Sequence, residues 1–338
     1  MNALDLIEEE LSEPTPGVAD DLASLDGDIV VLGVGGKVGP SVAIMAQRAI
    51  ESAGLDKRVF GVARFSDERA KSSLERHGVI PVQADLTDDR QLASLPDAPN
   101  VIYMAGKKFG TVGEEHTTWM MNSYLPGRVA DRYRQSRIVA FSTLVTYPLA
   151  DAGLGGSRES DAQGPIGEYA ASCLGRERVF EHFSRVNGTP VLLFRLAYAI
   201  ETRYGVLLEI ARAVKDGVAI PLEMGHVSVI WQRDVAGYAL RSLRLAATPP
   251  RALNITGPEI VSVRWLAHRF AERFGVEPVF EGTESGTAYV LDGSDLQSEF
   301  GFPTTTLQEM IGRVAEWVEE SGPTIGKPTK FQIRDGAF

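Results

Sequence analysis

The stretch Ile29-Val30-Val31-Leu32-Gly33-Val34-Gly35-Gly36-Lys37-Val38-Gly39-Pro40 decides the fold of this chain. Its apolar first residues predict a buried strand, and a helical pattern follows from Pro40, a residue that the first turn of a helix accommodates. Glycines at this turn let the backbone approach a pyrophosphate with no Cβ in the way, and the helix N-terminus attracts its charge. We therefore predict that a dinucleotide is bound by the loop residues Gly33, Gly35, Gly36, Lys37, Val38 and Gly39.

Short apolar runs alternate with helical stretches as far as Arg195. Expected strands cover residues 29–32, 59–62, 79–82, 101–104, 138–141 and 191–194, and expected helices cover 41–53, 67–76, 117–134 and 169–184. Short apolar strands separated by helices are typical of a parallel sheet that is covered on both faces. The pattern predicts an α/β fold: a Rossmann doubly wound parallel sheet with a smaller mixed α/β C-terminal substrate domain.

The alternation changes after Arg195, and both ends of the chain differ from the middle. Leu4, Ile7 and Leu11 have helical spacing within an N-terminal extension that we place at 1–26. We expect the Rossmann domain at 27–198 and 228–256 and the substrate domain at 199–227 and 257–322. Residues 323–338 are rich in glycine, proline and charge, and we expect them to form a C-terminal tail.

Charge and composition argue against several classes of partner. The net charge of −11 disfavours nucleic acid, whose phosphates an acidic surface repels. The single cysteine excludes an internal disulfide and fits a reducing compartment. No apolar run reaches the ~18–20 residues of a membrane span, and the acidic start does not resemble a signal peptide. We therefore expect a cytoplasmic protein that binds neither nucleic acid nor membrane.

The end of the second expected strand bears on the choice of dinucleotide. An NAD enzyme usually carries an acidic residue here for the ribose 2′-hydroxyl, but this strand ends in Val62-Ala63-Arg64. Arg64 is instead suited to a 2′-phosphate, with help from Lys37. The sequence favours NADP as the cofactor, with NAD possible, and indicates no metal.

Several further motifs follow the glycine loop in a fixed order. They are Asp85-Leu86, Met104-Ala105-Gly106, Asn122, Ser142-Thr143-x-x-x-Tyr147, Tyr169-x-x-Ser172-Cys173-x-x-x-Glu177 and Arg195. In this order the chain resembles the extended short-chain dehydrogenase/reductase family, the NAD-dependent epimerase/dehydratase group, from about Asp28 to Glu320. The resemblance implies that the cofactor is also contacted by Asp85, Leu86, Ala105, Gly106, Lys107 and Tyr169.

The resemblance also implies a proton-transfer chemistry. Tyr169 would exchange a proton with a substrate hydroxyl or carbonyl while hydride moves between that carbon and the nicotinamide. Thr143 would hold the substrate oxygen, with Ser142 as second choice. A free tyrosine has a pKa of about 10, and the family lowers it with a nearby lysine and the oxidised nicotinamide.

That lysine is absent, and Cys173 stands in its place. We consider four interpretations. In the first, Lys107 or Lys108 replaces the missing cation, and in the second, the substrate needs no strongly acidified tyrosine and Cys173 only lines the site. In the third, the protein is a catalytically impaired dinucleotide sensor or regulator. In the fourth, Cys173 is itself a nucleophile, which would require a lowered thiol pKa.

The remaining motifs narrow the reaction and the substrate. Leu144-Val145 follows Thr143 where the resembling dehydratases place an Asp-Glu pair, so dehydration is disfavoured. We predict an oxidoreductase or epimerase acting on a hydroxyl or carbonyl carbon of a sugar-like small molecule. Resemblance also implies a homodimer formed by the helices expected at 117–134 and 169–184. The residues expected on the substrate side are Asn122, which resembles a structural asparagine of the family, and Tyr198, Arg203, Tyr204 and Trp231.

Overall fold

The computed structural model describes residues 3–108 and 110–337. Its main element is a seven-stranded sheet with the order β11-β7-β5-β4-β1-β2-β3. The pairs β1–β2, β1–β4, β2–β3 and β4–β5 are parallel. The strands are β1 (Ile29–Leu32), β2 (Val59–Ala63), β3 (Ile80–Gln83), β4 (Asn100–Tyr103), β5 (Arg137–Thr143), β7 (Val191–Leu196) and β11 (Arg251–Ile255). The predicted Rossmann sheet is confirmed.

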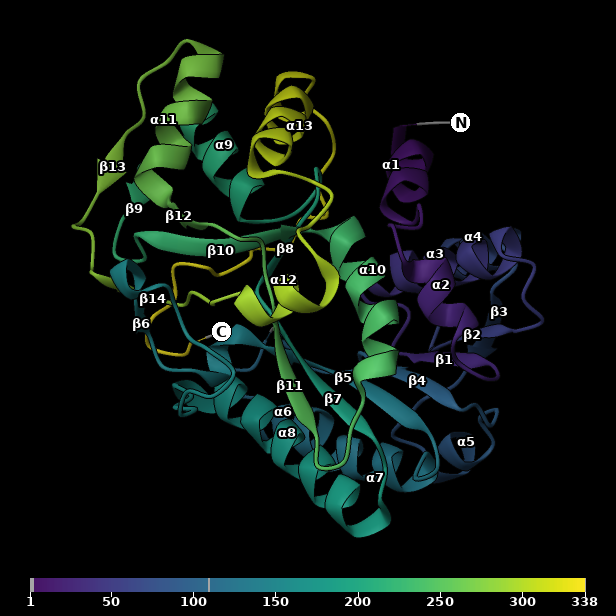
Figure 1. Ribbon diagram of the computed structural model, residues 1–338. Helices are drawn as coiled ribbons and strands as arrows, with labels where there is room; N and C mark the ends of the chain where they lie inside the picture. Colours follow the sequence, from purple (N-terminus) through teal and green to yellow (C-terminus); the bar gives the residue numbers. More distant parts are fainter. Residues whose placement is uncertain (1–2, 109, 338) are drawn as a thin grey trace. The chain divides into compact units, whose positions relative to one another are not determined.

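Helices cover both faces of this sheet, with α3 on one side and α7 on the other (Figure 1). These helices are α3 (Gly39–Ser52), α4 (Glu68–Arg76), α5 (Asp89–Ala93), α6 (Glu115–Trp119), α7 (Leu125–Arg132), α8 (Gly167–Asn187) and α10 (Gln232–Arg241). The helix expected at 117–134 is interrupted, because a π-helical turn at Met120–Tyr124 lies between α6 and α7. A wide turn of this kind is frequent at functional sites.

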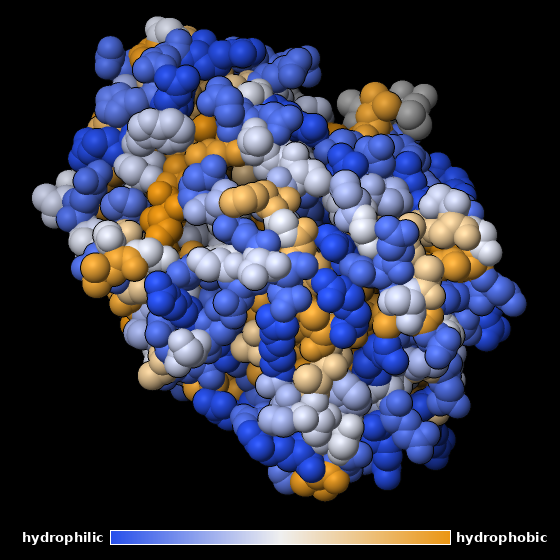
Figure 2. Space-filling model, in the orientation of Figure 1, coloured by the Kyte–Doolittle hydropathy of each residue, from blue (hydrophilic) through white to orange (hydrophobic). Residues whose placement is uncertain are grey.

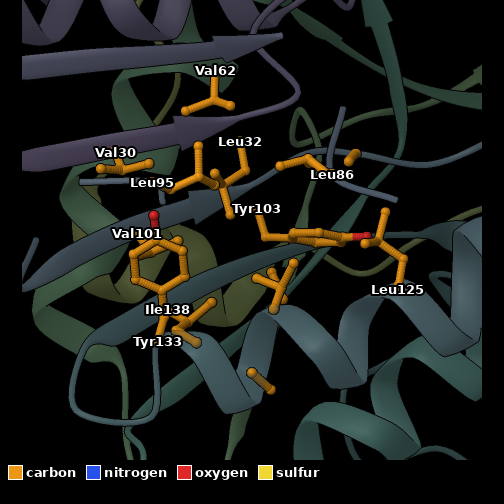
Figure 3. Packing of buried hydrophobic residues seen from close by; sticks show 14 of the residues in the cluster. Val30, Leu32, Val62, Leu86, Leu95, Val101, Tyr103, Leu125, Tyr133 and Ile138 are labelled. Atoms are coloured by element: carbon orange, nitrogen blue, oxygen red, sulfur yellow. The ribbon is translucent and has the colours of Figure 1, made fainter. Parts of the chain in front are cut away.

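The core on the α7 side follows the two-residue period of the strands. Val30 and Leu32 of β1 point to the same face as Val101 and Tyr103 of β4, as alternate residues must. Figure 3 shows these side chains packed with Leu125 of α7 and with other buried residues of the sheet. Hydrophilic side chains cover most of the molecular face drawn in Figure 2, with hydrophobic ones in smaller groups.

The chain divides into two compact units. One contains Met1–Ser142, Ala171–Phe194 and Arg233–Leu253, and the other contains Thr143–Ala170, Arg195–Gln232 and Asn254–Phe338. The second unit holds three smaller sheets with the orders β12-β10-β8, β13-β9 and β14-β6. Their strands are β6 (Ala150–Asp151), β8 (Tyr198–Ile200), β9 (Ile220–Pro221), β10 (His226–Trp231), β12 (Ile260–Ser262), β13 (Phe280–Glu281) and β14 (Thr287–Ala288). Its further helices are α9 (Val206–Asp216), α11 (Val263–Phe274), α12 (Ser294–Phe300) and α13 (Leu307–Glu319).

The N-terminal extension forms α1 (Ala3–Leu11) and α2 (Val18–Ala23), which are held to the first unit by ion pairs. Glu9 pairs with Arg48 of α3 at 3.2 Å, and Asp21 pairs with Arg241 of α10 at 2.7 Å. The side chain of Thr15 fills the space beside Gly237, where a Cβ would collide with it. The extension is therefore a docked part of the first unit.

The C-terminal segment is also anchored, within the second unit. The Thr329 hydroxyl donates to a Glu209 carboxylate oxygen at 2.6 Å, and Phe331 is buried. The Arg334 guanidinium donates to the Thr287 hydroxyl at 2.8 Å and to the Glu223 carbonyl at 2.9 Å. Gly336 then packs on the first residue of α8, so that a Cβ at Gly336 would lie 2.7 Å from the Gly167 Cα. The segment therefore reaches the start of the helix that carries Tyr169.

No helix among the described residues is both long enough and apolar enough to cross a membrane.

Two glycines of the C-terminal segment allow the contact with α8 to be tested. Gly336 and Gly326 both have a positive φ, but only Gly336 has close neighbours. We expect Gly336→Ala to lower the melting temperature by at least about 3 °C more than Gly326→Ala, because both variants carry backbone strain and only the first collides with Ile166. Differential scanning calorimetry measures the two transitions. Equal shifts would contradict a packed contact at α8.

Candidate functional site

The loop between β1 and α3 is shaped by close backbone contacts. Gly33 has a φ of +89°, and a Cβ there would lie 2.8 Å from the backbone nitrogen of Ala105, just after β4. At Gly39, a Cβ would lie 2.4 Å from the carbonyl oxygen of Val34. The first and last glycines of the motif are therefore required by the packing of the chain itself.

The middle glycine is different. A Cβ at Gly36 would meet the Gly33 carbonyl oxygen at 3.4 Å, an ordinary contact, and nothing closer among the described residues. The Gly36 N–H donates to that same oxygen at 3.1 Å. The packing of the described chain therefore does not explain why this position lacks a side chain.

Two charged residues lie at the adjacent strand ends. Arg64 follows β2 and is exposed, and Asp85 follows β3. The Asp85 carboxylate accepts hydrogen bonds from the Thr87 N–H at 2.9 Å and the Thr87 hydroxyl at 2.7 Å. These bonds hold the pKa of Asp85 below its usual value, and the positive charge of Arg64 contributes to the same effect. Leu86 beside them is buried.

The turn after β4 is fixed by Asn122, a fully buried residue of the π-helical turn. The Lys107 N–H donates to Asn122 Oδ1 at 2.8 Å, and Asn122 Nδ2 donates to the Lys107 carbonyl at 2.9 Å. The Lys107 ammonium lies 3.6 Å from a Glu114 carboxylate oxygen. Lys108 is half-buried. Asn122 thus holds the backbone that follows Ala105 and Gly106.

The residues predicted for the site did not include Arg176 of α8, a buried cation that contacts this turn. Its side chain donates to the Phe141 carbonyl at 2.7 Å and to Asn122 Oδ1 at 2.8 Å, and the residue is only 7% exposed. A Cβ at Gly106 would lie 2.4 Å from the guanidinium. The available signal was helical spacing, because residue 176 shares a face of α8 with Cys173 and Tyr169.

The neighbouring hydroxyls Ser142 and Thr143 at the end of β5 have different surroundings. The buried Ser142 hydroxyl donates to a Glu177 carboxylate oxygen at 2.5 Å. Thr143 is half-buried, and among the described residues its hydroxyl oxygen accepts only a long contact of 3.5 Å from the Val145 N–H. The Ser142 hydroxyl is thus bonded to the buried Glu177 carboxylate, and the Thr143 hydroxyl is not.

Tyr169 and Cys173 lie one turn apart on α8, so they share a helix face. Tyr169 is largely buried, and the Cys173 thiol is fully buried, 4.0 Å from Asn122 Nδ2. Two other motif residues meet in the second unit, where the buried guanidinium of Arg195 donates to the Tyr147 hydroxyl. Tyr147 in turn donates to Asn254 Oδ1 at 3.0 Å.

The residues expected on the substrate side have several environments. The buried Tyr198 hydroxyl has no hydrogen-bond partner within residues 3–108 and 110–337. Burial and the nearby Glu209 charge raise the pKa of Tyr204 to about 12. The Arg203 guanidinium lies 3.1 Å from the buried Glu201 carboxylate, so it already has a counter-ion. The Trp231 ring is buried beneath Arg313, 5.3 Å from the guanidinium carbon.

No group of three or more His, Cys, Asp or Glu side chains within the described ranges is gathered as ligands of a metal ion would be.

No protein-family model and no curated protein sequence matches the chain. Solved structures do match it, over 87% of the chain in each of three cases. UDP-glucose 4-epimerase with UDP-glucose from Thermotoga maritima is 18% identical, with a TM-score of 0.69 over 99% of its chain. The dTDP-glucose 4,6-dehydratase DesIV from Streptomyces venezuelae, with NAD and TYD bound, is 18% identical, with a TM-score of 0.71 over 97% of its chain. UDP-glucuronic acid 4-epimerase from Bacillus cereus in complex with NAD is 14% identical, with a TM-score of 0.70 over 99% of its chain.

The chain therefore has the fold of the NAD-dependent epimerase/dehydratase group of short-chain dehydrogenases/reductases, as its motifs predicted.

The glycine loop yields a prediction on stability alone. We expect Gly39→Ala to lower the melting temperature by several degrees, about 4 °C or more, because its Cβ collides with the backbone of Val34. Gly36→Ala is the matched control and should change it by less than about 1 °C. Thermal unfolding of both ligand-free variants measures the difference. A large loss in Gly36→Ala would mean that packing does require the middle glycine.

Proposed function

We propose that this protein is an NAD(P)-dependent oxidoreductase or epimerase that acts on a hydroxyl or carbonyl carbon of a sugar-like small molecule. The observation that carries the proposal is Gly36, where the strand-to-helix loop keeps its backbone bare although the neighbouring described chain does not require it. A bound pyrophosphate supplies the missing reason, since it needs close approach to the backbone at a helix N-terminus. Solved structures of the same fold include one in complex with UDP-glucose and NAD and one with NAD and TYD bound.

The residues at the strand ends suit a dinucleotide. The loop from Gly33 to Gly39 would hold the pyrophosphate, with the N-terminus of α3 providing positive partial charge. Asp85 and Leu86 would contact the adenine, and Ala105, Gly106 and Lys107 would line the nicotinamide half. When bound, the dinucleotide supplies the hydride acceptor or donor of the reaction.

The exposed Arg64 supports NADP over NAD as the preferred cofactor. It lies at the end of β2, and the carboxylate of Asp85 beside it is occupied by Thr87. A guanidinium can bind a 2′-phosphate through two parallel hydrogen bonds, whereas it gains little from a neutral 2′-hydroxyl.

Tyr169 and Thr143 are the residues proposed to act on the substrate. The Tyr169 hydroxyl would give a proton to the substrate oxygen in reduction and take it in oxidation. Thr143 would hold that oxygen, because within the described part of the chain its hydroxyl makes only a long contact with Val145, whereas the Ser142 hydroxyl donates to Glu177. Of the two candidates, the surroundings favour Thr143.

The unpartnered Tyr198 hydroxyl supports a polar, hydroxyl-bearing substrate. A buried hydroxyl without a hydrogen bond carries a cost of about 1–3 kcal/mol, which a ligand hydroxyl can remove. Arg203 is a weaker candidate for an anionic group, because Glu201 already neutralises it.

A turnover assay with variants of Tyr169 and of the adjacent residues Ser142 and Thr143 tests this function. UDP-glucose, UDP-glucuronic acid and dTDP-glucose, each with NADP⁺ or NAD⁺, form the first substrate panel, with products separated by chromatography. We expect Tyr169→Phe to lower turnover by about 10²–10⁴-fold with little change in melting temperature. Thr143→Ala should lower turnover, whereas Ser142→Ala should lower stability more than turnover, because it strips a donor from the buried Glu177.

Full turnover in Tyr169→Phe would contradict the assigned proton transfer. Dinucleotide binding without conversion of any sugar in the panel would contradict these nucleotide sugars as substrates and favour the sensor interpretation.

A further inference from the structure

Arg176 is a buried cation in direct contact with the turn after β4. Its guanidinium donates to the Phe141 carbonyl, to Asn122 Oδ1 and, at 3.4 Å, to the Asn122 carbonyl. These acceptors come from β5 and from the π-helical turn, so one side chain of α8 links three elements of the first unit. A buried charge is tolerated only when such partners satisfy it.

The guanidinium occupies the volume that a side chain at residue 106 would need. A Cβ at Gly106 would lie 2.4 Å from Arg176 and 2.9 Å from Asn122 Oδ1. The same Asn122 amide holds both backbone polar groups of Lys107. Arg176 therefore acts on the turn twice, by direct packing at Gly106 and through Asn122 at Lys107.

Cys173 lies close to this cation. Its sulfur is 4.0 Å from Asn122 Nδ2, the other end of the amide whose oxygen accepts from Arg176. Both residues also lie near the buried hydroxyl of Tyr103: burial raises the pKa of this tyrosine, and the positive charge of Arg176 offsets part of the increase. A lysine in place of Cys173 would put a second cation near the guanidinium of Arg176. In such a poorly solvated space, like charges repel strongly.

We propose that Arg176 is the fixed cation of this site, that it positions the turn Ala105–Gly106 against the cofactor, and that its presence is why residue 173 is a neutral cysteine. The cofactor part rests on the proposed function, whereas the exclusion of a second cation does not. Lys107 is less suited to this task, because its ammonium pairs with Glu114.

Charge and size can be separated at position 173. We compare Cys173→Lys with Cys173→Met, a neutral side chain of similar length, in the wild-type and the Arg176→Met backgrounds. Melting temperatures are measured without ligand, and NADPH and NADH dissociation constants by fluorescence titration. Gly106→Ala is a further variant that disturbs the same turn without removing a charge.

In the wild-type background, we expect Cys173→Lys to melt about 5 °C or more below Cys173→Met. In the Arg176→Met background, this difference should shrink or reverse, because the repelling guanidinium is gone. We expect Arg176→Met and Gly106→Ala each to weaken dinucleotide binding by about tenfold. The Arg176→Met/Cys173→Lys double variant should recover part of that affinity, which a purely structural role of Arg176 would not produce.

Two results would overturn the inference. The first is an equal effect of lysine and methionine at position 173 in both backgrounds. The second is dinucleotide affinity that Arg176→Met and Gly106→Ala leave unchanged. Absence of dinucleotide binding by the wild-type protein would instead contradict the proposed function, and the ligand-free melting temperatures would still test whether Arg176 excludes a second cation. If Arg176→Met does not fold, Arg176→Gln replaces it as the background, since it removes the positive charge and keeps an N–H donor for the buried acceptors.

Discussion

The close approach of the ends of β1 and β4 is the constraint on which this structure depends. Only a glycine fits at residue 33, because a Cβ would lie 2.8 Å from the backbone of Ala105. That contact brings the loop before α3 beside the turn after β4, and Gly106 in the same turn leaves space for Arg176. The glycines at residues 33 and 106 thus bring the loop of Gly36 beside the turn that Arg176 contacts.

Much of the fold could be predicted because its signals are local. Apolar runs predicted the strands β1 to β5 and β7 to within two residues at each end, and the glycine spacing predicted the turn into α3. The interruption of the helix expected at 117–134 could not be predicted, because the partners of Asn122 in this turn are Lys107 and Ser172 of α8, which local patterning does not connect to it. The anchoring of the C-terminal segment escaped prediction for the same reason, since Thr329 and Arg334 are polar residues whose partners are remote.

The site was predicted as a set of positions, and the structure adds their surroundings. Ser142 and Thr143 are adjacent in sequence, but only Ser142 is bonded to the buried Glu177. Arg203 has Glu201 as its counter-ion, and the two-residue spacing between them did not predict this ion pair. Arg176 was not assigned to the site because charged residues are usually exposed, and its helical spacing to Cys173 and Tyr169 does not reveal the remote partners that bury it.

The most direct test of the account is the affinity of the dinucleotide-free protein for NADPH and for NADH, measured by isothermal titration calorimetry. The account predicts saturable binding of both at one site per chain, with the lower dissociation constant for NADPH because of Arg64. Tighter binding of NADH would contradict the role given to Arg64, and no binding of either would contradict the central claim that the carboxyl ends of these strands form a dinucleotide site.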